Sequence, residues 1–189
     1  MSYSYPLDSV FTDDLTTNVT QHTYPYTNFD KLNIVDSCNG IICIANFNNT
    51  YPLLWNLSIR TFKELPPIQK EKLISDIDQS FGFGYDSCKD NCKVVVVQDI
   101  SDDINFDCVN KVEVMVHTLG TNFWKSIQEC PFGVLSTREY GKFVSGRINW
   151  LASIDFQEQS PCFIVSFDLG KESYQKVLPP VSFANTFKD

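Results

Sequence analysis

Apolar residues recur with a period of two in the middle of the chain. In residues 111–119 (KVEVMVHTL), valine occupies every second position from Val112 to Val116. Just upstream, residues 93–98 (KVVVVQ) form a continuous run rich in β-branched side chains. The first pattern is typical of a half-buried strand, and the second has the length and composition of a strand. The sequence therefore predicts two β-strands here, separated by the acidic stretch 99–107 (DISDDINFD).

Turn-forming residues extend this region to four strands. The segment 81–86 (FGFGYD) precedes the valine run, and Gly120, Thr121 and Asn122 follow the alternating stretch. Residues 123–127 (FWKSI) are then predicted as the returning strand. Four short strands joined in this way form an antiparallel meander, which cannot bury both of its faces alone. The meander therefore needs neighbouring sheets.

The chain supplies such neighbours on either side. Asn39 and Gly40 stand between two apolar runs, which is the strongest local signal for a hairpin. Ser145 and Gly146 are predicted to make the corresponding turn downstream. The upstream unit has predicted strands at 31–35, 41–46, 53–56 and 61–65. The downstream unit has predicted strands on both sides of its turn within 141–152, and at 162–168 and 173–178.

The three units share one pattern, in which an apolar strand and a turn are followed by a strand that begins with an aromatic residue. Phe62, Trp124 and Tyr174 are the equivalent aromatic residues. The preceding positions also align, with Trp55, Asn56 and Leu57 matching Phe167, Asp168 and Leu169, and His117, Thr118 and Leu119 matching both. Four strands in a repeat of roughly fifty residues are typical of kelch-like propeller blades. The predicted fold is all-β, with antiparallel four-stranded units arranged as a partial kelch-like β-propeller of about three blades.

Two parts of the chain are expected to be organised differently. Residues 1–30 are predicted to be a poorly ordered leader, in which 3–11 (YSYPLDSVF) can lend one edge strand, and residues 31–189 form the propeller domain. Residues 71–77 are predicted as a short helical turn. Three units cannot close a propeller ring, so we expect Ile41, Ile44, Val165 and Phe167 to keep apolar surface in water.

Composition narrows the function classes. The chain of 189 residues has a net charge of −8 and no run of basic residues. This argues against binding to nucleic-acid phosphates or to an anionic membrane surface. Neither a membrane-spanning apolar run nor a signal peptide is found, and the number of cysteines, seven, is odd. We therefore expect a cytoplasmic or nuclear protein whose cysteines are all free thiols.

Several residue clusters invite a metal or catalytic interpretation. Two cysteine pairs resemble parts of a zinc site, namely Cys38 with Cys43 and Cys88 with Cys92. A complete site would need His22 or His117 as a further ligand, and we instead interpret these cysteines as strand or turn thiols. Asp103, Asn105 and Asp107 begin like a calcium loop, but Cys108 and Val114 stand where glycine and glutamate are required. Gly82 and Gly84 are not followed by a helix and are interpreted as points of close strand approach. The sequence thus predicts no catalytic, cofactor-binding or metal-binding residues.

Seven segments occur in an order that resembles the plant F-box-associated domain of F-box/kelch-repeat proteins. They are SCNGIICIAN, LLWNLSIRTFKELPP, FGFGYD, CKVVVVQ, VEVMVHTLGTNFWKSI, GKFVSGRINWLA and FIVSFDLGKESYQKV, and they cover residues 31 to about 180. The resemblance implies a β-propeller-like array that holds a target protein, while an F-box tethers it to an SCF-type ubiquitin ligase. The chain departs from the family in having no F-box pattern and three units. It also has Leu57 where proline is more usual and Asn149 where histidine is common.

The expected function is a non-catalytic protein-binding module. Its expected partners are an unknown target protein and, only in a longer form that carries an F-box, the SCF adaptor. The predicted recognition surface consists of residues 68–80, 99–110 and 156–161, whose acidic character suits a partner with a basic patch. The alternatives are a truncated and inactive fragment, or an enzyme built on a propeller fold. The identity of the target stays open.

Overall fold

The computed structural model describes ten stretches of the chain. They are residues 2–4, 20–22, 32–46, 49–68, 79–99, 112–128, 130–132, 134–135, 140–153 and 162–178. The chain divides into two compact units, Met1–Leu32 and Asn33–Asp189. In the first unit, β1 (Ser2–Ser4) pairs antiparallel with β2 (Thr20–His22) in a two-stranded sheet of its own. The predicted helical turn at 71–77 lies outside the described residues.

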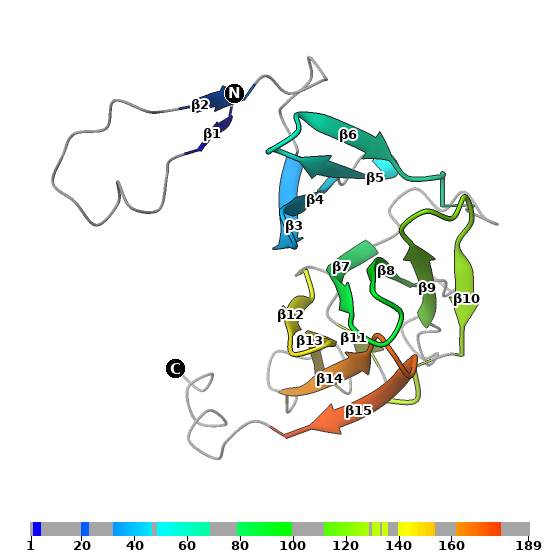
Figure 1. Ribbon diagram of the computed structural model, residues 1–189. Helices are drawn as coiled ribbons and strands as arrows, with labels where there is room; N and C mark the ends of the chain where they lie inside the picture. Colours follow the sequence, from blue (N-terminus) through cyan, green and yellow to red (C-terminus); the bar gives the residue numbers. More distant parts are fainter. Residues whose placement is uncertain are drawn as a thin grey trace, which may run out of the picture. The chain divides into compact units, whose positions relative to one another are not determined.

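The second unit contains three antiparallel sheets, as predicted (Figure 1). The first sheet consists of β3 (Leu32–Cys38), β4 (Ile41–Asn46), β5 (Asn49–Asn56) and β6 (Thr61–Glu64). The second consists of β7 (Gln79–Asp86), β8 (Asn91–Asp99), β9 (Val112–Thr118) and β10 (Lys125–Ile127). The third consists of β12 (Lys142–Val144), β13 (Arg147–Ser153), β14 (Cys162–Asp168) and β15 (Ser173–Val177), with the two-residue strand β11 (Val134–Leu135) as a fifth member. None of the described residues forms a helix that is long and apolar enough to span a bilayer.

Two hairpins close with the two-residue turns that the sequence predicts. Asn39 and Gly40 have φ values of 50° and 76°, and Ser145 and Gly146 have 48° and 80°. Positive φ at both central positions is the geometry of the type I′ turn, whose twist matches that of the strands it joins. Local chemistry therefore sets the register of β3 on β4 and of β12 on β13.

Three longer turns share a different device. The side-chain Oδ1 atoms of Asn56, Asp86 and Asp168 each accept hydrogen bonds from the backbone N–H groups two and three residues later. The residue four positions on has a positive φ, at Arg60, Asp90 and Glu172. Such a side chain replaces strand partners for the first N–H groups of the turn. Hydrogen bonds within each turn therefore stabilise its backbone conformation.

The aromatic residues of the repeat lie at equivalent places in the three sheets. Trp55 is directly opposite Phe62, and Phe167 is directly opposite Tyr174 with ring centroids 5.0 Å apart. In the second sheet, the rings of His117 and Trp124 are 5.2 Å apart. The alignment made from the sequence is therefore confirmed.

Apolar cores fill the two spaces between the sheets. Val94 and Val96 of β8 pack toward the first sheet, whereas Val95 and Val97 pack toward the third. Both faces of the second sheet are thus buried, which is why β8 is a continuous valine run rather than an alternating one. Each buried valine stabilises the fold by about 1.5–3 kcal/mol relative to an exposed one.

The expectation of exposed apolar faces was wrong for the residues named. Val165 and Phe167 are fully buried because their side of β14 faces the second sheet. Ile44 is also buried, and Ile41 packs partly against the core between the first and second sheets. Alternation identifies the two faces of a strand, but it does not say which of them meets the neighbour.

Gly82 and Gly84 mark points of close approach between the second and third sheets. A Cβ atom at Gly82 would lie 2.4 Å from Cγ2 of Ile148 and 2.9 Å from Cζ2 of Trp150. One at Gly84 would lie 2.2 Å from Cδ2 of Phe143. The glycines of FGFGYD are therefore points of close approach, as predicted, because side chains of the third sheet occupy the space a Cβ would need.

We predict that Gly82→Ala lowers the free energy of unfolding by about 1–3 kcal/mol, the usual cost of overpacking a core. Gly170→Ala is the control, because the nearest atom to its added Cβ would be Sγ of Cys88, at 3.1 Å and at the surface. Urea unfolding followed by tryptophan fluorescence measures both. Equal stability of Gly82→Ala and the parent chain would contradict the packing described here.

Candidate interaction surfaces

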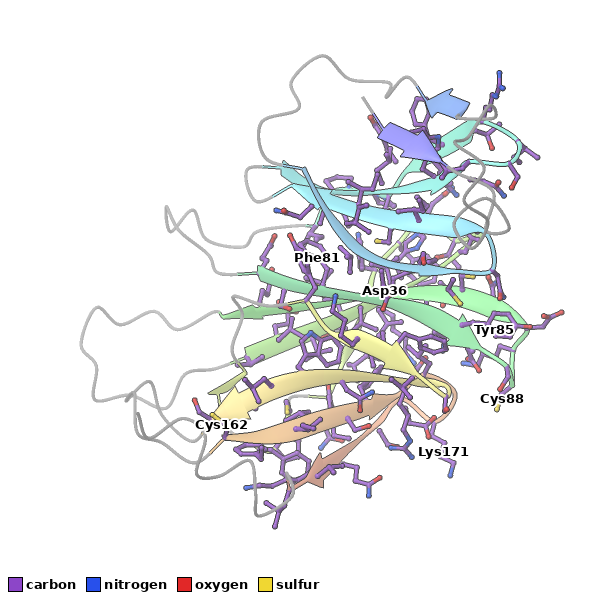
Figure 2. All side chains as sticks on the ribbon, turned by 90° about the vertical axis from the view of Figure 1, so that its left-hand side faces the viewer. Asp36, Phe81, Tyr85, Cys88, Cys162 and Lys171 are labelled. Carbon is purple, nitrogen blue, oxygen red and sulfur yellow. The ribbon has the colours of Figure 1, made fainter. Side chains whose placement is uncertain are left out.

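The strand order places two kinds of connection at opposite ends of the three sheets. At one end, which we call the turn end, lie the turns 39–40, 57–60, 87–90, 119–124, 145–146 and 169–172. At the other, the loop end, lie the strand termini Asn46, Asn49, Gln79, Asp99, Val112, Ser153 and Cys162. Figure 2 shows Tyr85, Cys88 and Lys171 on one side and Cys162 on the other.

The predicted recognition surface belongs to the loop end. Apart from their first or last residues, the segments 68–80, 99–110 and 156–161 lie outside the described residues, so their role stays a prediction. Side-chain hydrogen bonds join the strands that border the first two of these segments. Gln79 Nε2 donates to Gln98 Oε1 at 3.1 Å, and Gln98 Nε2 donates to Glu113 Oε2 at 2.8 Å. This chain of side-chain hydrogen bonds crosses three strands and fixes where the segments start.

A buried lysine joins the second and third sheets at the turn end. Lys93 on β8 is 1% exposed, and its Nζ lies 2.9 Å from Asp86 Oδ2, 3.1 Å from Glu172 Oε1 and 2.6 Å from the carbonyl oxygen of Leu169. Leu169 O and Glu172 Oε1 accept hydrogen bonds from Nζ, and Asp86 Oδ2 forms an ion pair with it. Lys125 Nζ lies 2.5 Å from Glu172 Oε2, and Lys89 Nζ lies 3.7 Å from Glu172 Oε1. Glu172 is therefore shared by three lysines.

The charged groups of this cluster stabilise one another in their ionised forms. Burial alone raises the pKa of Asp86, but hydrogen bonds from Lys93 and the backbone of Cys88 outweigh burial and leave the pKa below its usual value. Burial also favours the neutral form of Lys93, yet its bonds to Asp86 and Glu172 raise its pKa. The pKa of Glu172 is lowered for the same reason as that of Asp86, by Lys125 and Lys93. All three groups are charged at neutral pH.

His117 lies between the second and first sheets, as Lys93 lies between the second and third. Its side chain is fully buried, and Nε2 lies 3.1 Å from the carbonyl oxygen of Thr121, so Nε2 carries the proton. Nδ1 is buried without a hydrogen-bond partner. Burial, and then the nearby charge of Lys63, lower the pKa of His117 despite the bond to Thr121. The imidazole is neutral and structural in this position.

The neighbouring tryptophan continues this contact. Trp124 packs against the imidazole and donates from Nε1 to the carbonyl oxygen of Pro66 at 2.9 Å. The second sheet is thereby bound to the segment that leaves the first. The sequence repeat placed His117 and Trp124 together, but it did not indicate the link to Pro66.

The cysteines considered as metal ligands lie in different environments. Cys43 and Cys92 are buried, Cys38 is partly buried and Cys88 is exposed, and the six described cysteines are free thiols. Burial raises the pKa of Cys43 and keeps it protonated, which disfavours metal binding. Within the described part of the chain, no group of three or more His, Cys, Asp or Glu side chains is arranged to hold a metal ion. Cys108 and the acidic residues Asp103 and Asp107 lie outside that part.

The three antiparallel sheets of the second unit follow one another along the chain and pack face to face. This arrangement defines a β-propeller domain. The chain belongs to the F-box associated β-propeller domain family, whose model matches residues 2–188. It is 24% identical over 168 residues to an F-box/kelch-repeat protein of Arabidopsis thaliana, with 88% of this chain and 44% of the relative covered.

Two further F-box proteins of the same plant are also similar. The chain is 28% identical over 198 residues to the F-box protein CPR1, with 97% of this chain and 46% of the relative covered. It is 30% identical over 156 residues to another, with 80% of this chain and 31% of the relative covered. The chain thus spans less than half of the length of these curated relatives.

The buried cluster gives a stability prediction. Lys93→Met removes the cation between Asp86 and Glu172. We expect this variant to lower the free energy of unfolding by about 3–5 kcal/mol, because two carboxylates are left without their central partner. Lys125→Met is the control, since that lysine is more than half exposed and its ion pair is worth at most about 1 kcal/mol. Chemical denaturation measures both. Equal losses for the two variants would show that Lys93 does not bind the sheets together.

His117 gives a pH prediction. Its pKa is lowered in the folded state, so the unfolded chain takes up its proton first as the pH falls below about 6.5. The free energy of unfolding should therefore decrease from pH 7 to pH 5, by at most about 1.4 kcal/mol per pH unit from this residue. Denaturation at both pH values compares the chain with His117→Gln, which keeps a donor for Thr121 but cannot titrate. A pH dependence that is unchanged in the variant would overturn this assignment.

Proposed function

We propose that the chain is a non-catalytic protein-binding module that recruits a target protein to an SCF-type ubiquitin ligase. Membership of the F-box associated β-propeller family carries this proposal. The sheets supply a rigid scaffold, and loops on rigid scaffolds usually carry specificity. Tethering to the ligase adaptor would require an F-box in the same polypeptide, and its place of action would be the cytoplasm or the nucleus.

The target is proposed to bind at the loop end. The sequences between the strand termini there, 69–78, 100–111 and 154–161, contain eight Asp or Glu against three Lys. Such a surface attracts a basic patch, most strongly at low salt. The hydrogen-bonded strand ends Gln79, Gln98 and Glu113 would hold the base of this surface in place.

A non-catalytic role also agrees with the environment of His117, the histidine on β9, whose imidazole would be a general base in an enzyme. His117 is fully buried, and its Nε2 is engaged by the backbone of Thr121. A general base has to reach the proton it removes, and a buried imidazole held in this way does not. The alternative of a propeller-fold enzyme therefore has no support from His117.

Affinity purification with mass spectrometry from plant cells tests the proposal. The chain is expressed behind an F-box segment, and we expect to recover the ligase adaptor together with one or a few target proteins. Replacing 69–78, 100–111 and 154–161 with neutral Gly-Ser segments of equal length should abolish target recovery and leave adaptor recovery unchanged. Target recovery that survives all three replacements would place the recognition surface elsewhere.

A further inference from the structure

Each of the three sheets has an exposed apolar side chain at the turn end, with a basic residue close by in the sequence. Of the large apolar residues in the described parts of the chain, Ile59, Phe123 and Val144 are among the most exposed, with 66%, 63% and 59% of their surface accessible. Each sheet contributes one of them. A basic residue follows closely in each case, namely Arg60, Lys125 and Arg147. Exposed apolar residues with a charged surround are typical of interaction sites.

The acidic groups at this end are largely neutralised within the protein. Glu172 is shared by Lys89, Lys93 and Lys125. Asp168 pairs with Arg147 at 3.0 Å. Lys89 and Lys125 nevertheless keep 55% and 59% of their side chains exposed, and Lys171 is exposed on the adjoining turn. The three lysines are therefore exposed at the turn end, next to Asp90, whose carboxylate accepts a hydrogen bond from the hydroxyl of Tyr85.

The lysines come from two turns and the start of one strand, which the fold brings together. Lys89 lies in the turn after β7, Lys125 begins β10, and Lys171 lies in the turn after β14. Lys89 and Lys125 both lie within 4 Å of the same carboxylate, that of Glu172, which adjoins Lys171. Figure 2 shows Lys171 and Cys88 on the same side of the molecule. No basic run in the sequence indicates this grouping.

The supporting turns are rigid. The backbone N–H groups of Lys89 and Lys171 are held by Asp86 Oδ1 and Asp168 Oδ1 at 3.3 Å and 2.9 Å. The carboxylate beneath the lysines is fixed by the buried Lys93. A partner therefore loses little binding free energy to ordering this surface.

We propose that the turn end binds an acidic segment of a partner protein, with Lys89, Lys125 and Lys171 holding its carboxylates and Phe123 packing against an apolar residue of the same segment. The mixture of exposed apolar and cationic groups fits a peptide better than a nucleic acid, whose backbone favours a broad basic surface. This surface lies opposite the proposed target site. A target and a second protein can consequently be bound at the same time.

Fluorescence anisotropy tests the proposal with a short labelled peptide of glutamate and leucine residues. We expect saturable binding that weakens as salt is raised. The triple variant Lys89→Ala, Lys125→Ala, Lys171→Ala should bind at least roughly tenfold more weakly, equivalent to about 1.4 kcal/mol. The control variant Lys63→Ala, Lys142→Ala, Lys176→Ala loses the same charge outside the turn end and should bind like the parent. Phe123→Ser should weaken binding at every salt concentration, because its contact is apolar.

Three outcomes would overturn the proposal. They are no binding by the parent chain at low salt, equal weakening in the two triple variants, or displacement of the peptide by single-stranded DNA at a lower concentration than by unlabelled peptide. Thermal melting checks that every variant is folded, and the single change Lys171→Glu replaces the triple variant if the latter is not. The Gly-Ser replacements at the loop end should leave peptide binding intact. Failure of this site is therefore distinguishable from failure of the proposed function.

Discussion

The burial of both faces of the second sheet is the constraint on which the rest of the structure depends. The valines of β8 point alternately to the two cores, so neither core can form unless a further sheet stacks on each side. Stacking this close leaves no room for a side chain at Gly82. It also removes polar groups at the same level from bulk solvent, which favours hydrogen-bond partners inside the protein. The Lys93 cluster and the bonded Nε2 of His117 are two consequences of that requirement.

A buried ion cluster is an unusual way to join two sheets, because apolar residues of similar size often stabilise a fold as well or better. Lys93 does something that a valine could not. Two directed hydrogen bonds from Nζ reach the β14–β15 turn at Leu169 and Glu172, so they fix the position of the third sheet along the second as well as the distance between them. We regard positional specificity as the reason for this lysine, a hypothesis that the Lys93→Met variant examines by its effect on stability.

Local patterns in the sequence predicted most of the strands, the Asn39-Gly40 and Ser145-Gly146 turns, and the threefold repeat of the aromatic residues. These features depend on neighbours within a few residues. Most features that depend on long-range contacts were not predicted, and the close approach at Gly82 and Gly84 is the exception. The two-residue strand β11 has no periodicity to detect, and the burial of Val165 depends on which face of β14 meets the second sheet. The lysines of the turn end are dispersed in the sequence, so charge patterning along the chain did not reveal them.

The two ends of the sheets differ because their connections differ. A tight turn such as 145–146 or 169–172 needs fixed backbone angles and internal hydrogen bonds, so its length and shape are constrained by the strands that it joins. The segments 69–78, 100–111 and 154–161 are longer, and lengthening a surface connection costs little free energy. Under the proposed function, variation in target recognition can therefore accumulate at the loop end without disturbing the cores. The turn end cannot vary in that way, and a surface with fixed geometry is better suited to one recurring partner than to many different targets.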